Sequence, residues 1–210
     1  MSYTINDFGI ATYNNFLPYG RLKVSTARSS WIVSLAEAKA HLRIESGYTV
    51  DDTYITLLLK IAQDIVEKET SLLLSAVGIT YIADGFLPVI DLGVNGSAVA
   101  SVKYYDTANA QQTLAVNTDY YVSNLSYLNE SIRIYPSTNN NWPDTFDKPD
   151  SVEVIFTAGC STNDVPLGLY QATLLIIGRY YEMRQDVGTG MFDIPKGATH
   201  LINQYNRATI

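Results

Sequence analysis

The sequence predicts an α+β protein, in which a small helical bundle formed by N- and C-terminal helices carries an inserted antiparallel β module. Apolar residues recur at helical spacing over residues 34–71 and again over residues 166–205. Between these segments, residues 77–157 alternate in hydropathy and are rich in Tyr, Val, Ile and Thr. No helical stretch separates the strands expected there, so an antiparallel sheet or small barrel is favoured over a parallel sheet.

Four segments follow from these patterns: an N-terminal arm (1–33), the first part of the bundle (34–74), the β module (75–160) and the second part of the bundle (161–210). Residues 1–30 show no sustained period and contain Asn14-Asn15, Pro18 and Gly20. This composition is typical of an extended arm or of short irregular strands, and such arms often order against a neighbouring subunit.

Two helices are expected in the first part of the bundle. Ser34 followed by Glu37 matches a capping box, and this first helix should end before Gly47. Asp51 and Asp52 are expected to cap the second helix, which should run to about Ser71. Its apolar stripe comprises Ile55, Leu58, Ile61, Ala62, Ile65 and Leu72.

The β module contains five clear strand patterns, at residues 79–83, 99–105, 120–122, 132–135 and 152–156. Residues 106–109 form a plausible turn, and residues 137–150 form a loop that contains Trp142-Pro143.

Val165-Pro166 introduces the second part of the bundle, because proline fits the first turn of a helix. The helix that follows is apolar over most of its circumference, so several sides of it must be covered, and a second subunit can cover one of them. We therefore expect subunit-interface residues on it. The candidate interface residues on this helix are Leu174, Ile177, Tyr180 and Tyr181.

A last short helix follows Pro195 and carries Ala198, Leu201, Ile202 and Tyr205 on one face.

Composition limits the function. The chain has 210 residues, of which 47% are apolar and 17% charged, which excludes a wholly disordered protein. The net charge of −7 disfavours non-specific nucleic-acid binding. Most of this acidity lies between Ser71 and Cys160, with nine acidic and three basic residues. With no signal peptide or membrane-spanning pattern, we expect a soluble protein made in a reducing cytoplasm, and no membrane partner.

Residues for chemistry are scarce. The single cysteine, Cys160, excludes an intramolecular disulfide and any multi-cysteine zinc site. His41 and His200 are the only histidines, and no metal-ligand or phosphate-loop spacing is present. We therefore predict a protein that is not an enzyme, with no catalytic, cofactor-binding or metal-binding residues and no cofactor. A cysteine-dependent hydrolase using Cys160 remains an alternative.

Sixteen tyrosines, several of them in adjacent pairs, are the unusual feature of the composition. Tyrosine suits protein interfaces and sugar platforms, although half-buried strands favour it as well. A carbohydrate-binding β module on a helical stalk, using Tyr120 and Trp142, is therefore a second hypothesis.

An ordered set of short motifs gives a more specific indication. The last third runs from the strand Val152–Gly159 through Val165-Pro166 to Arg179-Tyr180-Tyr181-Glu182-Met183-Arg184, then Ile194-Pro195-Lys196-Gly197 and residues 201–207. Residues 35–44, the segment from Asp51-Asp52 to Glu69-Thr70, strand 101–106 and Trp142-Pro143 match in the same order. Over residues 34–207 the chain resembles the head–tail connector (adaptor) proteins of long-tailed bacteriophages.

The resemblance implies a structural virion protein, made in a bacterial host and located in the neck of the particle. Such proteins form a ring, usually of twelve copies, beneath the portal. The ring extends the DNA channel without binding DNA specifically, and it supports a stopper, head-completion or tail protein. Family members contact the portal through their C-terminal part, which here points to Leu201, Ile202, Tyr205 and Arg207.

Overall fold

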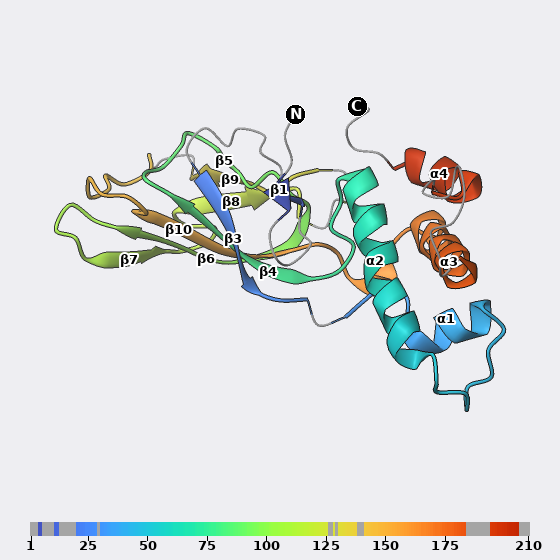
Figure 1. Ribbon diagram of the computed structural model, residues 1–210. Coiled ribbons are helices and arrows are strands. Elements are labelled where there is room, and N and C mark those ends of the chain that lie inside the picture. The colour runs from blue at the N-terminus through green and yellow to red at the C-terminus, as the bar shows by residue number, and fades with distance from the viewer. Residues whose placement is uncertain are drawn as a thin grey trace. The chain divides into compact units, whose positions relative to one another are not determined.

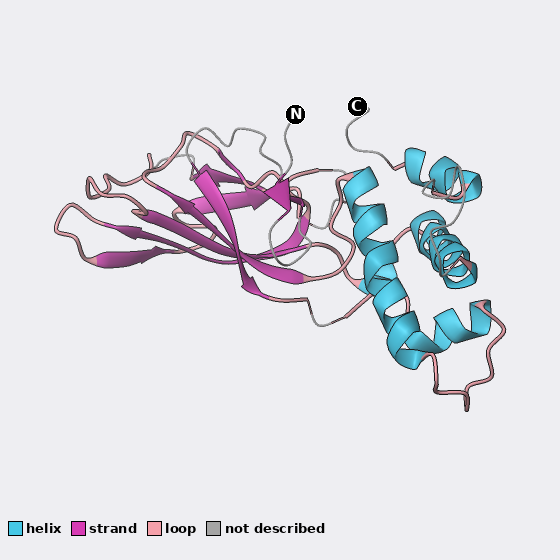
Figure 2. Ribbon diagram, in the orientation of Figure 1, coloured by secondary structure: helices cyan, strands magenta, loops and turns pink. Residues whose placement is uncertain are grey.

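Strands and helices separate into two units of the chain. The computed structural model describes residues 4–5, 11–12, 20–28, 30–125, 128, 130–137, 141–183 and 194–205. One compact unit, the β unit, comprises Met1–Ser29 and Ser75–Cys160; the other, the helical unit, comprises Ser30–Leu74 and Ser161–Ile210. All described strands fall in the β unit and all described helices in the helical unit (Figure 2). The protein is therefore of mixed α+β class, with antiparallel sheets between terminal helical segments.

A five-stranded sheet forms the larger part of the β unit, with the strand order β3-β4-β10-β6-β7 (Figure 1). All neighbouring strands in it are antiparallel, as predicted. The strands are β3 (Gly20–Thr26), β4 (Val77–Ala83), β6 (Gly96–Tyr105), β7 (Gln111–Leu114) and β10 (Val152–Ala158). The central strand β10 alternates strictly between buried and half-buried residues, the pattern of a strand with one face in a core. Its buried residues are Val152, Val154, Phe156 and Ala158.

The remaining strands form two small sheets. Strands β5 (Ile90–Asp91), β9 (Arg133–Pro136) and β8 (Tyr120–Ser123) make a three-stranded antiparallel sheet, and β1 (Thr4–Ile5) pairs with β2 (Ala11–Thr12). The three-stranded sheet buries Ile90, Ile132 and Ile134 almost completely. Ile132 also lies so close to Gly96 of β6 that any side chain at position 96 would clash with it.

An ion pair holds the end of this small sheet together. Arg133 Nε lies 3.0 Å from Asp91 Oδ2, and the backbone N–H of Gly93 donates to Asp91 Oδ1. Burial alone would raise the pKa of Asp91, but hydrogen bonds from Ser131, Gly93 and Arg133 outweigh burial and lower the pKa below 3.8. Folding therefore favours the ionised carboxylate.

Two glycines are required where backbone segments of the β unit meet. Gly159, directly after β10, has a φ of +85°, and an added Cβ would overlap the carbonyl oxygen of Ser75. Its N–H donates to the carbonyl oxygen of Asn95 at 2.8 Å. Gly20, at the start of β3, lies directly against the buried ring of Tyr81, which leaves no room for a Cβ.

Residues 20–26, for which the sequence left an extended arm or short irregular strands open, form a regular strand. They form β3, an edge strand that pairs along its length with β4. Leu22 and Val24 alternate with the exposed, charged Arg21 and Lys23, a pattern that fits a sheet edge facing solvent.

The described residues of the helical unit form four α-helices and one short 3₁₀ helix (Thr162–Asp164). The α-helices are α1 (Leu35–His41), α2 (Asp52–Thr70), α3 (Leu167–Glu182) and α4 (Lys196–Asn203). α3 packs against α1, α2 and α4 (Figure 1). The core contains Ile55, Leu58, Ala62 and Val66 of α2, Leu169, Ala172 and Ile176 of α3, and Ala198 and Ile202 of α4.

The predicted helix ends are partly confirmed. Ser34 and Glu37 form both hydrogen bonds of a capping box. The hydroxyl and the backbone N–H of Ser34 both donate to Glu37 Oε2, and these two bonds lower the pKa of Glu37. α2 ends at Thr70, with Ser71 in the left-handed conformation. The expected capping by Asp51 is wrong, because its side chain makes no cap hydrogen bond. Asp51 Oδ2 instead accepts a 2.6 Å hydrogen bond from Tyr181 of α3.

Candidate assembly surfaces

The candidate residues for chemistry in the described part of the chain are one cysteine and two histidines. This described part holds no group of three His, Cys, Asp or Glu residues that could bind a metal ion. Cys160 is half-buried at the end of the β unit, whereas His41 and His200 belong to the helical unit. The His41 ring lies over Gly178 of α3, so this histidine takes part in helix packing. Among the helices that the structure describes, none is long and apolar enough to cross a membrane.

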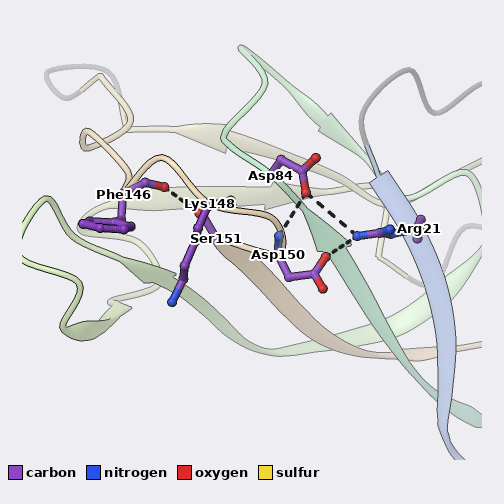
Figure 3. Close-up of polar contacts among 6 residues, drawn as sticks. All are labelled: Arg21, Asp84, Phe146, Lys148, Asp150 and Ser151. Carbon is purple, nitrogen blue, oxygen red and sulfur yellow. Dashed lines mark hydrogen bonds and ion pairs between the residues drawn. The ribbon is translucent and has the colours of Figure 1, made fainter.

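A charged cluster joins the edge strand β3 to the turn before β10 (Figure 3). The Arg21 guanidinium contacts the carboxylate of Asp150 and lies 3.9 Å from that of Asp84. The backbone N–H of Asp150 also donates to Asp84 Oδ1 at 2.9 Å. Ser151 Oγ donates to the carbonyl oxygens of Phe146 and Lys148, which closes the turn. The charged side chains are more than half exposed, so the cluster fixes backbone geometry more than it adds stability.

The aromatic residues of the second hypothesis are engaged within the β unit. Trp142 stacks on Phe86, with ring centroids 4.5 Å apart and planes 2° apart. Its Nε1–H points toward the carbonyl oxygen of Pro88 at 3.4 Å. Tyr120 is only 2% exposed, whereas its neighbour Tyr121 is 43% exposed. Tyr120 is therefore a core residue, and one face of the Trp142 ring is covered by Phe86.

The four candidate interface residues of α3 differ in exposure. Ile177 is fully buried and Leu174 is 7% exposed, so both side chains belong to the core of the single chain. Tyr180 and Tyr181 are half-buried. The Tyr181 hydroxyl donates to Asp51, and Tyr54 Oη donates to the carbonyl oxygen of Tyr180 at 3.2 Å. Both tyrosines thus anchor α3 to α2 and keep part of their rings at the surface.

The C-terminal candidates for portal contact also differ in exposure. Ile202 is 2% exposed and anchors α4 in the core. Leu201 and Tyr205 are half-buried, and the Tyr205 ring packs against Gly168 of α3. Arg207 lies outside the described residues. Leu201 and Tyr205 therefore supply the partly exposed apolar surface at this end of the helical unit.

The loop between α1 and α2 is held by a buried charge. Lys39 is only 5% exposed, and its Nζ donates to the carbonyl oxygens of Ser46 and Tyr48 and to Asp52 Oδ1 at 2.8 Å. Every polar contact of this ammonium group stabilises the loop, so Lys39 is a structural residue.

The most exposed apolar residues of the helical unit were not among the surface candidates predicted from the sequence. Leu167 is 83% exposed, Val50 77% and Leu57 51%. Ile61, which the predicted stripe of α2 counted as core, is 37% exposed and lies one turn after Leu57. Leu57 is apolar but falls outside that stripe. Its position was the signal in the sequence that α2 has a second apolar face.

Comparisons with known proteins give matches at the level of structure. Scans against protein-family models and curated protein sequences gave no match. The fold is similar to a chain in the virion of a native gene transfer agent (GTA) particle, with a TM-score of 0.67 and 23% identity over 88% of this chain and 94% of that chain. It is also similar to a chain in the neck of an empty GTA particle computed with C6 symmetry, with a TM-score of 0.66 and 24% identity over 89% of this chain and 95% of that chain. A chain in the neck of a native GTA particle computed with C12 symmetry matches with a TM-score of 0.64 and 22% identity over 89% of this chain and 94% of that chain. At these identities the comparisons establish a shared fold over nearly the whole of both chains.

Proposed function

We propose that this chain is a structural subunit of a head–tail connector (adaptor) ring in the neck of a phage-like particle. One observation carries the proposal: the fold similarity to chains of GTA particles, two of them in the neck, covers 88–89% of this chain. That share exceeds either unit taken alone, so the similarity extends over both the β unit and the helical unit. The ordered sequence motifs over residues 34–207 point to the same family independently.

In this proposal the subunits form a closed ring beneath the portal, with twelve copies as the expected number. The ring joins the capsid to a stopper, a head-completion protein or the tail. A ring of identical subunits requires a heterologous interface, in which two different surfaces of each copy meet. The symmetries used for the compared necks, C6 and C12, are compatible with such a ring.

The charge of the chain suits a DNA conduit. A net charge of −7 repels phosphates, so DNA passing through the ring is not held by the counterion release that drives non-specific binding. We propose no catalytic activity and no cofactor for the protein.

The partly exposed end of the helical unit is the proposed contact with the portal. Leu201 and Tyr205 present apolar surface there, Ile202 holds α4 in place from the core, and Arg207 lies two residues after Tyr205 in the sequence. Leu201→Asp and Tyr205→Asp should therefore weaken portal binding.

Co-expression of the full chain with the portal protein of the same genome tests the proposal. Negative-stain and cryo-electron microscopy should show a ring, expected to hold twelve copies, attached to the portal. The portal expressed alone is the control. Absence of any ring or complex at high concentration of both proteins would refute the proposed function. Unchanged portal binding by both α4 variants would refute the proposed contact alone.

A further inference from the structure

We propose that neighbouring subunits of the ring meet through two surfaces of the helical unit, the outward face of α2 on one copy and the start of α3 on the next. This inference rests on the proposed function, because it specifies how copies of the chain contact each other in the ring.

The first surface is the α2 patch, which comprises Leu57, Lys60 and Ile61. Leu57 and Ile61 are 51% and 37% exposed and lie one helical turn apart. They project away from Ile55 and Leu58, which α2 buries almost completely in the core of the unit. The α2 patch is thus an apolar surface that the described residues of the chain leave partly exposed.

One positive charge flanks this surface. Lys60 is exposed and precedes Ile61 directly. Its Nζ lies 5.8 Å from the centroid of the Trp31 ring, a distance at which a cation and an aromatic face attract each other. The contact orients the ammonium group at the margin of the α2 patch.

The second surface is the α3 patch, which comprises Asp164, Leu167 and Gln171. Leu167 is the first residue of α3 and, at 83%, the most exposed large apolar side chain among the residues that the structure describes. Asp164 is exposed three residues before it, and Gln171 is exposed one turn after it. This patch therefore has an apolar centre with a negative charge at its margin.

Opposite charges decide which surfaces pair. If the α2 patch packed against the α2 patch of a second copy, two Lys60 side chains would approach each other. If the α3 patch packed against itself, two Asp164 side chains would do so. Like charges across an interface are unfavourable, whereas Lys60 against Asp164 is complementary. Pairing of two different patches is also the arrangement that closes into a ring.

The burial of the earlier candidates supports this choice. Ile177 is fully buried and Leu174 nearly so, so neither side chain can reach a second copy without disrupting the core. Leu57, Ile61 and Leu167 keep their surface free for contact. The apolar area that α3 offers to a neighbour therefore lies at its first turn.

Charge reversal tests the pairing in the full chain co-expressed with its portal. Lys60→Glu and Asp164→Lys should each lower the fraction of chain found in rings about tenfold, because each places like charges at every interface of the ring. The double variant Lys60→Glu/Asp164→Lys should restore most of the loss. Ring content is measured by sedimentation velocity and by particle counts in electron micrographs, and circular dichroism checks folding.

Apolar substitutions provide a second measurement with a matched control. Leu57→Asp and Leu167→Asp should each abolish rings while leaving the circular dichroism spectrum unchanged. Val116→Asp makes a comparable change at a residue that is 53% exposed in the β unit, and it should assemble normally.

Each other outcome overturns the inference in a distinct way. Wild-type levels of rings in all four single variants would show that these patches are not the interface, and the proposed function would stand. Loss of rings in the single variants without rescue in the double variant would refute the pairing of Lys60 with Asp164. Normal rings that no longer bind the portal would assign the patches to the portal. Failure of the wild-type chain to form rings with its portal would refute both proposals.

Discussion

The buried amide of Gln63 should contribute several kcal/mol to the stability of the helical unit. Gln63 has no exposed surface. Its Oε1 accepts a 2.9 Å hydrogen bond from the N–H of Ile32, and its Nε2 donates to Glu67 Oε1 at 2.8 Å. The same Glu67 oxygen accepts the N–H of Leu74 at 2.9 Å. Through Gln63 and Glu67, α2 therefore links the segment before α1 to the segment after α2.

The substitution Gln63→Leu nearly keeps the volume of this side chain and removes both hydrogen bonds. The buried N–H of Ile32 loses its acceptor, which costs about 1–3 kcal/mol, and Glu67 loses a donor to its carboxylate, which costs about 1.5–3 kcal/mol. The added apolar contact of leucine offsets part of this loss. We expect a net destabilisation of about 2–4 kcal/mol, a large fraction of the stability of a typical domain.

Urea unfolding followed by circular dichroism measures the effect. With a slope of about 2–3 kcal/mol per M, the midpoint should fall by roughly 1 M. Gln171→Leu makes the same change at an exposed position of α3, and it should leave the midpoint within about 0.2 M of the wild type. A Gln63→Leu midpoint as high as that of the control would show that the amide contributes nothing net to folding.

Three further substitutions test other features of the fold. Ser34→Ala removes the capping box of α1 and should cost about 1 kcal/mol in urea unfolding, which a cost near zero would contradict. Gly159→Ala should cost more than about 2 kcal/mol, because alanine is strained at positive φ and its Cβ meets the carbonyl oxygen of Ser75; a wild-type melting temperature would refute that account. Asp91→Asn should be less stable than the wild type at neutral pH. Because the pKa of Asp91 is lowered in the folded state, the stability it contributes is present above its unfolded pKa and is lost as the pH falls through its folded pKa. The two urea midpoints should therefore converge as the solution is acidified below the usual pKa of an aspartate; a constant difference would mean that the ionisation of Asp91 is not responsible.

Local patterns predicted most of the fold. The pairing of Ser34 with Glu37, the end of α2 near Ser71 and five of the strands follow from short-range spacing, and the structure confirms them. For residues 20–26 the sequence did not decide between an arm and a strand, because β3 is an edge strand and its described partner, β4, lies far along the chain. Strands β5 and β7 were also missed; they are short, and β7 is polar and mostly exposed.

The candidate surfaces were predicted less well. Periodicity showed that α3 is apolar over most of its circumference, but it could not show which sides α1, α2 and α4 cover. The candidates Leu174 and Ile177 lie on covered sides, whereas Leu167 lies on an open one. Ile61 was counted as core because it adjoins the apolar stripe of α2. The packing between helices determines which of these apolar side chains are buried, and this packing cannot be read from the periodicity of a single sequence.

The chain passes from one unit to the other three times, after Ser29, Leu74 and Cys160. During synthesis from the N-terminus, every described strand has therefore left the ribosome before α3 emerges, so the β unit can complete its sheets while the helical unit still lacks two helices. Until α3 and α4 arrive, the apolar side of α2, including Ile55 and Leu58, lacks its contacts with these two helices. The last fifty residues are thus the step that protects a nascent subunit from aggregation, because they bring the two helices that complete the core around α2.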